Sequence, residues 1–232
     1  MMETILQEGL TALSLSTDGI PALVRYAGLL AEKNKVMNLT AINAPSDVAR
    51  LHFLDSAALL TLHNFQKKTV IDIGTGAGFP GLPLRILEPS LSLPLLDAQN
   101  KRVDFLRDVC RELKLEDVVC VHERAEAFSL EHRESFDIAV SRAVAALPLL
   151  AELCLPLVKV GGTFLAMKSV DSSQELDASG RAVQLLGGQL QKPLDYTIPG
   201  TDLRHRLVII KKIEKTTKKY PRAFAKIKKN PL

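Results

Sequence analysis

The amino-acid sequence predicts an α/β fold: a mostly parallel sheet, covered by helices on both faces, with a helical extension at the N-terminus. Three observations support this prediction. Between residues 69 and 167, short apolar runs alternate with segments of helical periodicity, the pattern of successive strand–helix–strand units. Residues 4–63 show helical periodicity alone. A glycine-rich loop from Gly74 to Gly78 joins the first apolar run to the helix after it.

Three helices are expected in residues 1–64, which we interpret as an extension packed on the core. In the first two, apolar residues recur at spacings of three and four, so each helix has one face to bury. These residues are Ile5, Leu6, Leu10 and Leu13 in the first helix and Ile20, Leu23, Val24, Ala27, Leu30 and Ala31 in the second. The third helix begins near residues 45–47 and buries Val48, Leu51, Leu54 and Ala58.

Residues 65–212 are the expected core. Its strands are predicted at 69–73, 93–96, 118–121, 136–140, 163–167 and 207–210, and its helices at 80–87, 101–113, 144–153 and 172–186. Gly161 and Gly162 are expected to form a tight turn before the fifth strand. Pro94 has no backbone N–H, so a bulge or a local edge is expected in the second strand.

Charge is distributed unevenly along the chain. The 232 residues carry a net charge of +4, but residues 211–232 alone carry +8 and the rest carries −4. We treat residues 213–232 as a basic C-terminal tail. Such a tail suits a polyanion such as nucleic acid, and it is equally consistent with a segment that only keeps the protein in solution. Tyr220, Pro221 and Phe224 favour the first interpretation, because solubility alone does not need them.

Composition excludes several classes of protein. Apolar residues make up 47% and charged residues 24%, as in ordinary globular domains. The longest nearly uncharged run, residues 143–158, is shorter than the roughly 20 residues that a membrane span needs. No secretory signal opens the chain, and three cysteines without a C-x-x-C pair indicate reduced thiols, so we expect a cytoplasmic protein. The five histidines never occur at ligand spacing, so no metal site is expected.

The residues that indicate chemistry lie in and around the glycine loop. Gly74, Gly76 and Gly78 let the backbone turn sharply and approach a ligand without a Cβ in the way. Asp97 ends the second predicted strand, where a carboxylate can accept both hydroxyls of a ribose. The loop therefore predicts a nucleoside cofactor at the first crossover of the sheet.

Two details separate the possible cofactors. The spacing is G-x-G-x-G rather than the G-x-G-x-x-G of dinucleotide sites, and no G-K-[ST] follows as in a P-loop. Asp72, two residues before the loop, would repel a pyrophosphate but suits a cationic sulfonium ligand. The pattern is similar to motif I of S-adenosylmethionine-dependent methyltransferases, which we favour over a nicotinamide enzyme or a purely structural loop.

The methyl acceptor can be narrowed by what the sequence lacks. No N-P-P-Y loop for amine methylation follows the fourth predicted strand, where residues 141–144 read SRAV. Cys110, Cys120 and Cys154 lie in predicted apolar segments and are interpreted as small core residues rather than nucleophiles. An acceptor that is already nucleophilic, such as guanine N7, needs no thiol and no general base. Positioning alone can supply roughly 7–11 kcal/mol of the barrier reduction.

Segments along nearly the whole chain resemble one family, the bacterial small-subunit ribosomal RNA guanine-N7 methyltransferases, also called glucose-inhibited division protein B. The matching segments are 38–42 (NLTAI), 52–56 (HFLDS), 72–81 (DIGTGAGFPG), 96–103 (LDAQNKRV), 124–126 (RAE), 141–145 (SRAVA) and 220–222 (YPR). Several lie outside the generic cofactor fold. The resemblance implies a Rossmann-like methyltransferase fold with a mostly parallel seven-stranded sheet.

The resemblance also implies roles for individual residues. The expected cofactor-binding residues are Asp72, Gly74, Gly76, Gly78, Phe79, Asp97, Ala98, Gln99, Ala125, Glu126 and Arg142. Of these, Gly74 and Phe79 would border the amino-acid and sulfonium end of the cofactor, Asp97 to Gln99 the ribose and the adenine edge, and Ala125 and Glu126 the adenine. Arg142 is also the expected catalytic residue, bringing methyl group and base together.

Several candidate residues also have an alternative interpretation without a functional role. Glu126 could be an exposed acid at a helix start, and Arg142 could form a surface ion pair. Lys168 is equally consistent with a phosphate contact and with plain solvation. Arg50 and His52 are weaker candidates for RNA contact, and His52 is better interpreted as a helix histidine with satisfied hydrogen bonds.

The implied reaction is transfer of a methyl group from S-adenosylmethionine to N7 of a guanine in 16S ribosomal RNA. The implied partner is that RNA or the small ribosomal subunit, with no membrane partner, and we expect a monomer. Salt-dependent RNA affinity is assigned to Lys218, Lys219, Arg222, Lys226, Lys228 and Lys229. Two other functions stay open: methylation of a protein or a small molecule, and RNA binding without turnover.

Overall fold

The computed structural model describes residues 1–142 and 145–232. Its strands are β1 (Val70–Ile73), β2 (Leu93–Asp97), β3 (Val118–His122), β4 (Phe136–Arg142), β5 (Val158–Ser169), β6 (Gly188–Leu190), β7 (Leu194–Thr197) and β8 (Arg204–Lys212). Its α-helices are α1 (Met2–Ala12), α2 (Ile20–Met37), α3 (Pro45–Asp47), α4 (Asp55–Leu62), α5 (Gly81–Leu87), α6 (Asn100–Glu112), α7 (Ala125–Glu131), α8 (Leu147–Cys154), α9 (Ser173–Leu185) and α10 (Phe224–Lys229). A π-helical segment, η1 (Val48–Leu54), joins α3 to α4, and a 3₁₀ turn, η2 (Leu155–Leu157), follows α8.

The strands form one sheet in the order β3-β2-β1-β4-β5-β8-β6, with β7 also paired to β8. The first five strands are parallel, and β8 runs antiparallel to β5. Strands β6 and β7 pair with opposite ends of β8, so together they occupy the seventh position of the sheet. The predicted α/β fold with a mostly parallel sheet is confirmed, whereas β6 and β7 were not predicted.

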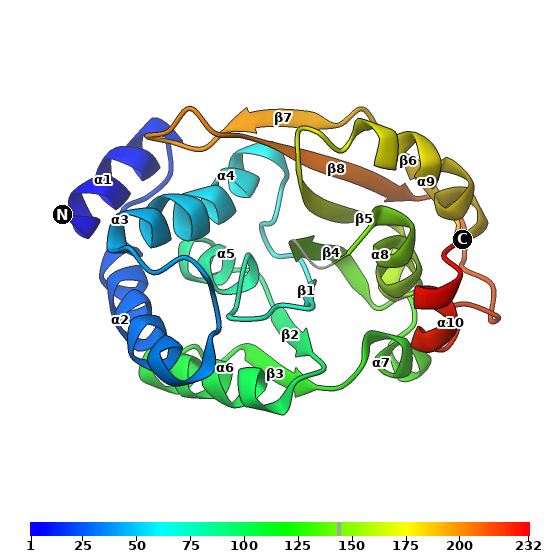
Figure 1. Ribbon diagram of the computed structural model, residues 1–232, viewed down its shortest axis with the longest axis horizontal. Coiled ribbons are helices and arrows are strands. Elements are labelled where there is room, and N and C mark those ends of the chain that lie inside the picture. The colour runs from blue at the N-terminus through cyan, green and yellow to red at the C-terminus, as the bar shows by residue number, and fades with distance from the viewer. Residues whose placement is uncertain (143–144) are drawn as a thin grey trace.

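Helices cover both faces of this sheet (Figure 1). Successive strand residues alternate between two apolar clusters: Val70 faces one and Ile71 the other, as do Leu95 and Leu96. The first cluster contains apolar residues of α1, α2, η1, α4, α5 and α6, and the second contains those of α7, α8, α9 and α10. Among the described residues, no helix is both long and apolar enough to cross a membrane.

The N-terminal extension packs against the first face as expected, with one addition. Leu6, Leu10 and Leu23 are fully buried, but Ala31 is exposed, so the predicted stripe of the second helix ends one residue earlier, at Leu30. Tyr26, which the stripe did not include, is fully buried and donates its hydroxyl hydrogen bond to the carbonyl of Ala77 in the glycine loop. The extension is thus bound directly to the loop.

Three expectations about the core strands and helices need correction. Gly161 and Gly162 lie inside β5 rather than in a turn before it, where the register against β4 shifts between Phe136 and Ile138. Pro94 causes no register shift, because β2 pairs in one continuous register with β3. The helix expected from residue 144 begins at Leu147, and residue 144 itself lies outside the described residues.

The C-terminal tail folds back onto the core. The Arg133 guanidinium donates hydrogen bonds to the carbonyls of Thr216 (2.7 Å) and Tyr220 (2.8 Å). Arg222 forms an ion pair with the fully buried Glu152 of α8, with Nη2 to Oε2 at 2.7 Å. Helix α10 follows and lies beside α8 and α7 (Figure 1). The lysines of the tail remain exposed on the surface of this folded segment.

Candidate cofactor and substrate site

A cavity of about 530 Å³ opens at the carboxyl ends of β1, β2 and β4. Ligands of open α/β sheets bind at this edge, because the loops after neighbouring strands diverge there. The extension, the core loops and the tail all contribute to its wall. Its lining includes Leu39, Thr40, His52, Gly74, Thr75, Gly76, Ala77, Phe79, Asp97, Ala98, Gln99, Arg102, Glu123, Arg124, Ala125, Glu126, Arg142 and Phe224.

The glycine loop forms the floor of this cavity. The carbonyl of Leu96 accepts hydrogen bonds from the N–H groups of Gly74 (2.8 Å) and Thr75 (3.2 Å), which bend the chain over the end of β2. Gly76 has a φ of +61°, and a Cβ built there would meet no atom closer than 4.0 Å, so its surface is open. Gly78 instead makes room for the extension, because a Cβ there would lie 2.5 Å from the Tyr26 hydroxyl. Gly78 is among the residues expected to contact cofactor, but it is not among those that line the cavity.

Asp72 lies beneath the loop rather than on the cavity wall. Its Oδ2 accepts hydrogen bonds from the Thr75 hydroxyl (2.7 Å) and the Gly81 N–H (2.9 Å), while its buried Oδ1 has no partner among the described residues. Burial raises the pKa of this carboxyl to about 6, although the two hydrogen bonds act in the opposite direction. Asp72 therefore fixes the loop and keeps one unsatisfied acceptor directly below it.

Asp97, Ala98 and Gln99, which are expected to hold the ribose and the adenine edge, line the cavity at the end of β2. Asp97 is 4% exposed; its Oδ2 accepts the N–H of Gly76 (2.9 Å) and its Oδ1 that of Gln99 (2.8 Å). Oδ1 can accept a further hydrogen bond, and the second contact of Oδ2 is a long one from Arg102 Nη1 (3.5 Å), which a ligand hydroxyl can displace. The arrangement suits a pair of vicinal hydroxyls.

Ala125 and Glu126 begin α7 and also line the cavity. The Glu126 side chain is 15% exposed and lies 3.8 Å from the Arg124 guanidinium. It is therefore not the exposed helix-start acid of the alternative interpretation. Arg124 in turn lies over the ring of Phe224, 5.1 Å from its centroid, so the tail completes this side of the wall.

On the other side of β1, Arg142 ends β4 within a buried polar cluster. Its Nη1 donates to the Leu51 carbonyl (3.0 Å) and contacts Asp55 Oδ2 (3.3 Å), and its Nη2 donates to His52 Nδ1 (2.9 Å). The side chain is only 15% exposed, so the alternative of a surface ion pair is wrong. The guanidinium also lies 5.0 Å from the centroid of the Phe79 ring. Arg142 thus presents a cationic, aromatic-lined wall, held from behind by the extension.

Asp55 joins this cluster to the C-terminal hairpin. It is fully buried, and its Oδ1 accepts the Tyr196 hydroxyl (2.8 Å) and contacts His205 Nδ1 (2.9 Å). The hydrogen bond and charge of Asp55 raise the pKa of His205. Asp55 thereby connects the extension to the end of β4, through Arg142, and to the hairpin of β7 and β8, through Tyr196 and His205.

His52 matches the expectation of a helix histidine with satisfied hydrogen bonds, and it also lines the cavity. Burial and the neighbouring Arg142 lower its pKa to about 3, so its ring is neutral. The ring stacks on Phe79 with centroids 4.3 Å apart, and both ring nitrogens have polar partners. Sequence reasoning missed Asp55, Tyr196, His205 and Phe224, although the segment 52–56 was among those that matched the family.

Two other candidates lie elsewhere. Lys168 is 11% exposed and donates to the Ala145 carbonyl and to Glu175 (2.7 Å), so neither a phosphate contact nor plain solvation describes it. Arg50 keeps its Nε buried and without a partner among the described residues, and it does not line the cavity.

The thiols are remote from the cavity. Cys110 and Cys120 face each other between α6 and β3, with 3.8 Å between their sulfur atoms, and Cys154 is buried in α8. None of the three is among the residues that line the cavity. No group of three or more potential metal ligands occurs in the part of the chain that the structure describes.

Solved structures similar to this one share its fold at low identity. The YcgJ protein of Bacillus subtilis aligns with a TM-score of 0.55 and 17% identity, covering 70% of this chain and all of that one. TrmN from Thermus thermophilus aligns at 0.53 and 18%, covering 68% and 48%. M. jannaschii TYW2, solved in complex with AdoMet, aligns at 0.53 and 12%, covering 67% and 72%.

Sequence relatives extend over the full chain. The protein of Clostridium tetani described as ribosomal RNA small subunit methyltransferase G is 45% identical over 214 residues, covering 91% of this chain and 90% of the relative. That of Alkaliphilus oremlandii, with the same description, is 44% identical and covers 100% and 99%. Residues 19–197 match the GidB family, described as rRNA small subunit methyltransferase G. The chain therefore belongs to this family of S-adenosylmethionine-dependent rRNA methyltransferases, as its motifs predict.

Proposed function

We propose that this protein transfers a methyl group from S-adenosylmethionine to N7 of a guanine in 16S ribosomal RNA, acting as a monomer in the cytoplasm. One observation carries the proposal. The cavity wall around Phe79 offers aromatic faces and hydrogen-bond donors but, among the described residues, neither a thiol nor a free general base. Guanine N7 is an acceptor that needs neither.

The residues at the other end of the cavity fit the proposed methyl donor. Asp97 would hold the ribose hydroxyls, and Glu126 with the Ala125 backbone would border the adenine. The open surface at Gly76 would let the cofactor approach the loop, and the unsatisfied Oδ1 of Asp72 would act below it. When bound, S-adenosylmethionine supplies an activated methyl group on a cationic sulfur.

The chain itself would contribute position and desolvation. The stacked rings of His52 and Phe79 and the guanidinium of Arg142 would fix the plane of the base at the end of β4. Because the N7 lone pair is free at neutral pH, no side chain would have to remove a proton. Arg142 would act from its anchored place rather than by reaching out, since three of its contacts bind it to the extension.

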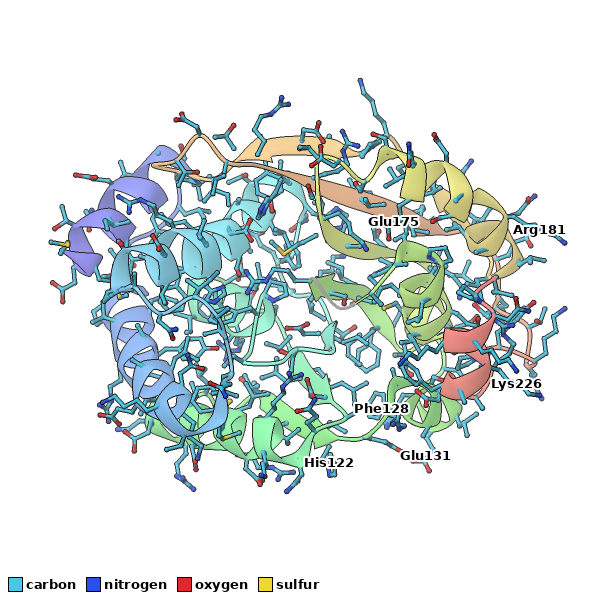
Figure 2. All side chains as sticks on the ribbon, in the orientation of Figure 1. His122, Phe128, Glu131, Glu175, Arg181 and Lys226 are labelled. Carbon is cyan, nitrogen blue, oxygen red and sulfur yellow. The ribbon has the colours of Figure 1, made fainter. Side chains whose placement is uncertain are left out.

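RNA affinity would come from five exposed lysines of the C-terminal segment, which we call the tail lysines. They are Lys218, Lys219, Lys226, Lys228 and Lys229. Lys226 projects outward from α10 (Figure 2), while Phe224 of the same helix lines the cavity. Arg222, assigned to RNA on the sequence alone, instead neutralises Glu152.

The deciding experiment compares small ribosomal subunits from cells that have and cells that lack this protein. Both are incubated with the purified protein and methyl-labelled cofactor. We expect label only in RNA of the subunits from deficient cells, and aniline cleavage after depurination at one guanine. Label in ribosomal protein would favour a different acceptor, and binding without any transfer would favour a non-catalytic RNA-binding protein.

Cofactor placement has its own test. Replacing Asp97 by Ala should weaken S-adenosylmethionine binding at least tenfold in calorimetry, because two hydroxyls lose a charged acceptor. The matched control is Asp104→Ala, an acid on the exposed side of α6 that should bind as the wild type does. Unchanged affinity in the Asp97 variant would refute the ribose assignment.

A further inference from the structure

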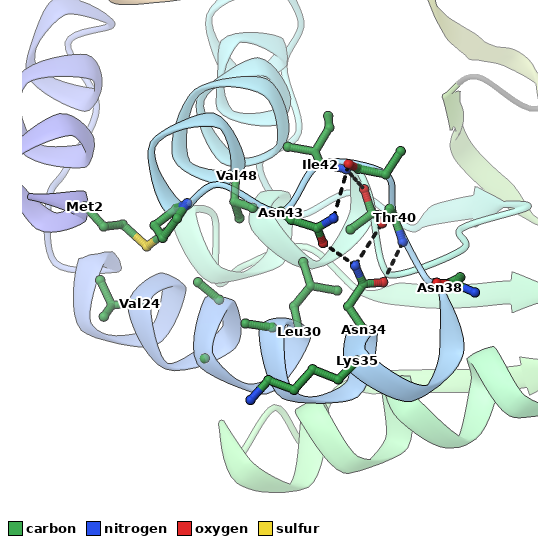
Figure 3. A pocket seen from close by; sticks show the side chains of 15 residues that line it. Met2, Val24, Leu30, Asn34, Lys35, Asn38, Thr40, Ile42, Asn43 and Val48 are labelled. Carbon is green, nitrogen blue, oxygen red and sulfur yellow. Dashed lines mark hydrogen bonds between the residues drawn. The ribbon is translucent and has the colours of Figure 1, made fainter.

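The loop between α2 and α3 contributes to the cavity and also to a second, largely apolar pocket of about 910 Å³, which Figure 3 shows. Thr40 lines both. Its backbone is fixed on two sides, because its N–H donates to Asn34 Oδ1 (2.9 Å) and its carbonyl accepts from Asn34 Nδ2 (2.8 Å). Asn34 is also hydrogen-bonded to Asn43 across the loop. The position of the Thr40 side chain is therefore set by the protein before any ligand binds.

The hydrogen-bond directions around His52 follow from the chemistry of Arg142. A guanidinium carries only donors, so His52 Nδ1 must accept from Arg142 Nη2. The ring is neutral, as its lowered pKa also indicates, so its single proton is on Nε2. That N–H is 2.9 Å from the Thr40 hydroxyl oxygen and donates to it.

The Thr40 hydroxyl can therefore still form one hydrogen bond, as a donor. Its oxygen accepts from His52 Nε2 and from the Ile42 N–H (3.1 Å), which uses both lone pairs. Its proton has no acceptor within the described part of the chain. A hydroxyl on the cavity wall with both lone pairs occupied can act only as a donor towards what the cavity holds.

Guanine carries the matching acceptor beside the atom that is methylated. Its N7 and O6 lie on the same edge, and adenine has an amino group, itself a donor, where guanine has O6. We propose that the Thr40 hydroxyl donates a hydrogen bond to O6 of the target guanine and so determines which purine is methylated. This inference rests on the proposed function and adds a specificity-determining residue to it.

The test combines two variants with two substrates. Small subunits are reconstituted with either guanine or 2-aminopurine, which has no O6, at the target position. The variants are Thr40→Ser, which keeps the hydroxyl, and Thr40→Val, which removes it at nearly the same volume. The kcat/KM for methylation is measured for each pair, together with cofactor affinity and melting temperature.

Wild type and the Ser variant should prefer guanine about tenfold more strongly than the Val variant does, the effect of one hydrogen bond in an enclosed site. Each preference is the ratio of kcat/KM for guanine to kcat/KM for 2-aminopurine. Comparing this ratio between two proteins cancels the different intrinsic reactivity of N7 in the two bases. Cofactor affinity should be equal in all three proteins.

Two outcomes would overturn the proposal. The Val variant could discriminate as strongly as wild type, or it could lose cofactor affinity, which would assign the hydroxyl to the cofactor. Failure of the proposed function is separate: wild-type protein would then place no label on guanine N7 in unmodified subunits.

Discussion

The ion pair between Arg222 and Glu152 gives the sharpest prediction about stability. The Arg222 guanidinium binds both carboxylate oxygens at 2.8 and 2.7 Å, and its backbone N–H binds one of them at 2.9 Å. Glu152 is fully buried, so Arg222→Ala leaves a charge without its partner, which costs about 3–5 kcal/mol in comparable pairs. Because the Arg222 side chain is 23% exposed and water can replace part of it, we expect the lower end, about 3 kcal/mol.

This loss can be measured by urea or thermal unfolding. For a chain of this length, about 3 kcal/mol corresponds to a melting temperature lowered by roughly 6–12 °C. Lys226→Ala, an exposed change on the neighbouring helix, is the control and should stay within about 0.5 kcal/mol of wild type. The double variant Glu152→Leu, Arg222→Met should regain most of the loss, since it buries no charge. A single Arg222→Ala variant as stable as wild type would refute the reasoning.

Three further predictions concern pH and salt. Asp55 raises the pKa of His205, so the charge of His205 stabilises the fold fully below about pH 6.5, and this stabilisation is lost as pH rises through the folded-state pKa. The unfolding free energies of wild type and His205→Gln should therefore converge at high pH. Parallel pH profiles of the two proteins would contradict this. The pKa of Asp72 is about 6, and a cationic sulfonium favours its carboxylate, so cofactor affinity should rise from pH 5 to 7 in wild type and stay flat in Asp72→Asn, as calorimetry would detect. Replacing the tail lysines by Gln should lower the slope of log affinity for RNA against log salt by about 0.7–0.9 per lost phosphate contact; an unaltered slope in filter binding would return these lysines to a solvating role.

Local signals in the sequence were sufficient for the five parallel strands and β8, and for the acid that lines the cavity at the end of β2. Each parallel strand is a short apolar run between turn residues, and Asp97 could be placed because it directly follows such a run. The short strands β6 and β7 were missed because their residues do not stand out: β7 reads LDYT and is half exposed. The bulge or local edge expected at Pro94 was a wrong prediction, because the register between β2 and β3 continues through this residue without a shift.

The buried polar cluster could not be predicted, because its members meet only in the folded chain. Asp55 and His205 are 150 residues apart, and Asp55 and Arg142 are 87 apart. The π-helical geometry of η1 is a second reason. Helical periodicity assumes 3.6 residues per turn, and η1 departs from it at His52, where it turns the ring towards Phe79 and Arg142. The three-residue spacing of His52 and Asp55 in the sequence gave no indication of that arrangement.

The extension and the tail are best understood as parts of the site. The core strands and the loops after them provide the glycine loop and the acids that suit a cofactor. The extension adds Thr40 and His52 to the wall that would receive a base, and the tail adds Phe224 to the opposite wall, beside Ala125 and Glu126. Asp55 and Glu152 are the buried carboxylates that fasten these added segments, one to Arg142 and the other to Arg222. Because an uncompensated buried charge is costly, each carboxylate ties the fold of its segment to the shape of the cavity. In the proposed function, specificity for the acceptor would depend on the contacts that hold the extension against the sheet, and cofactor binding on those that hold the tail.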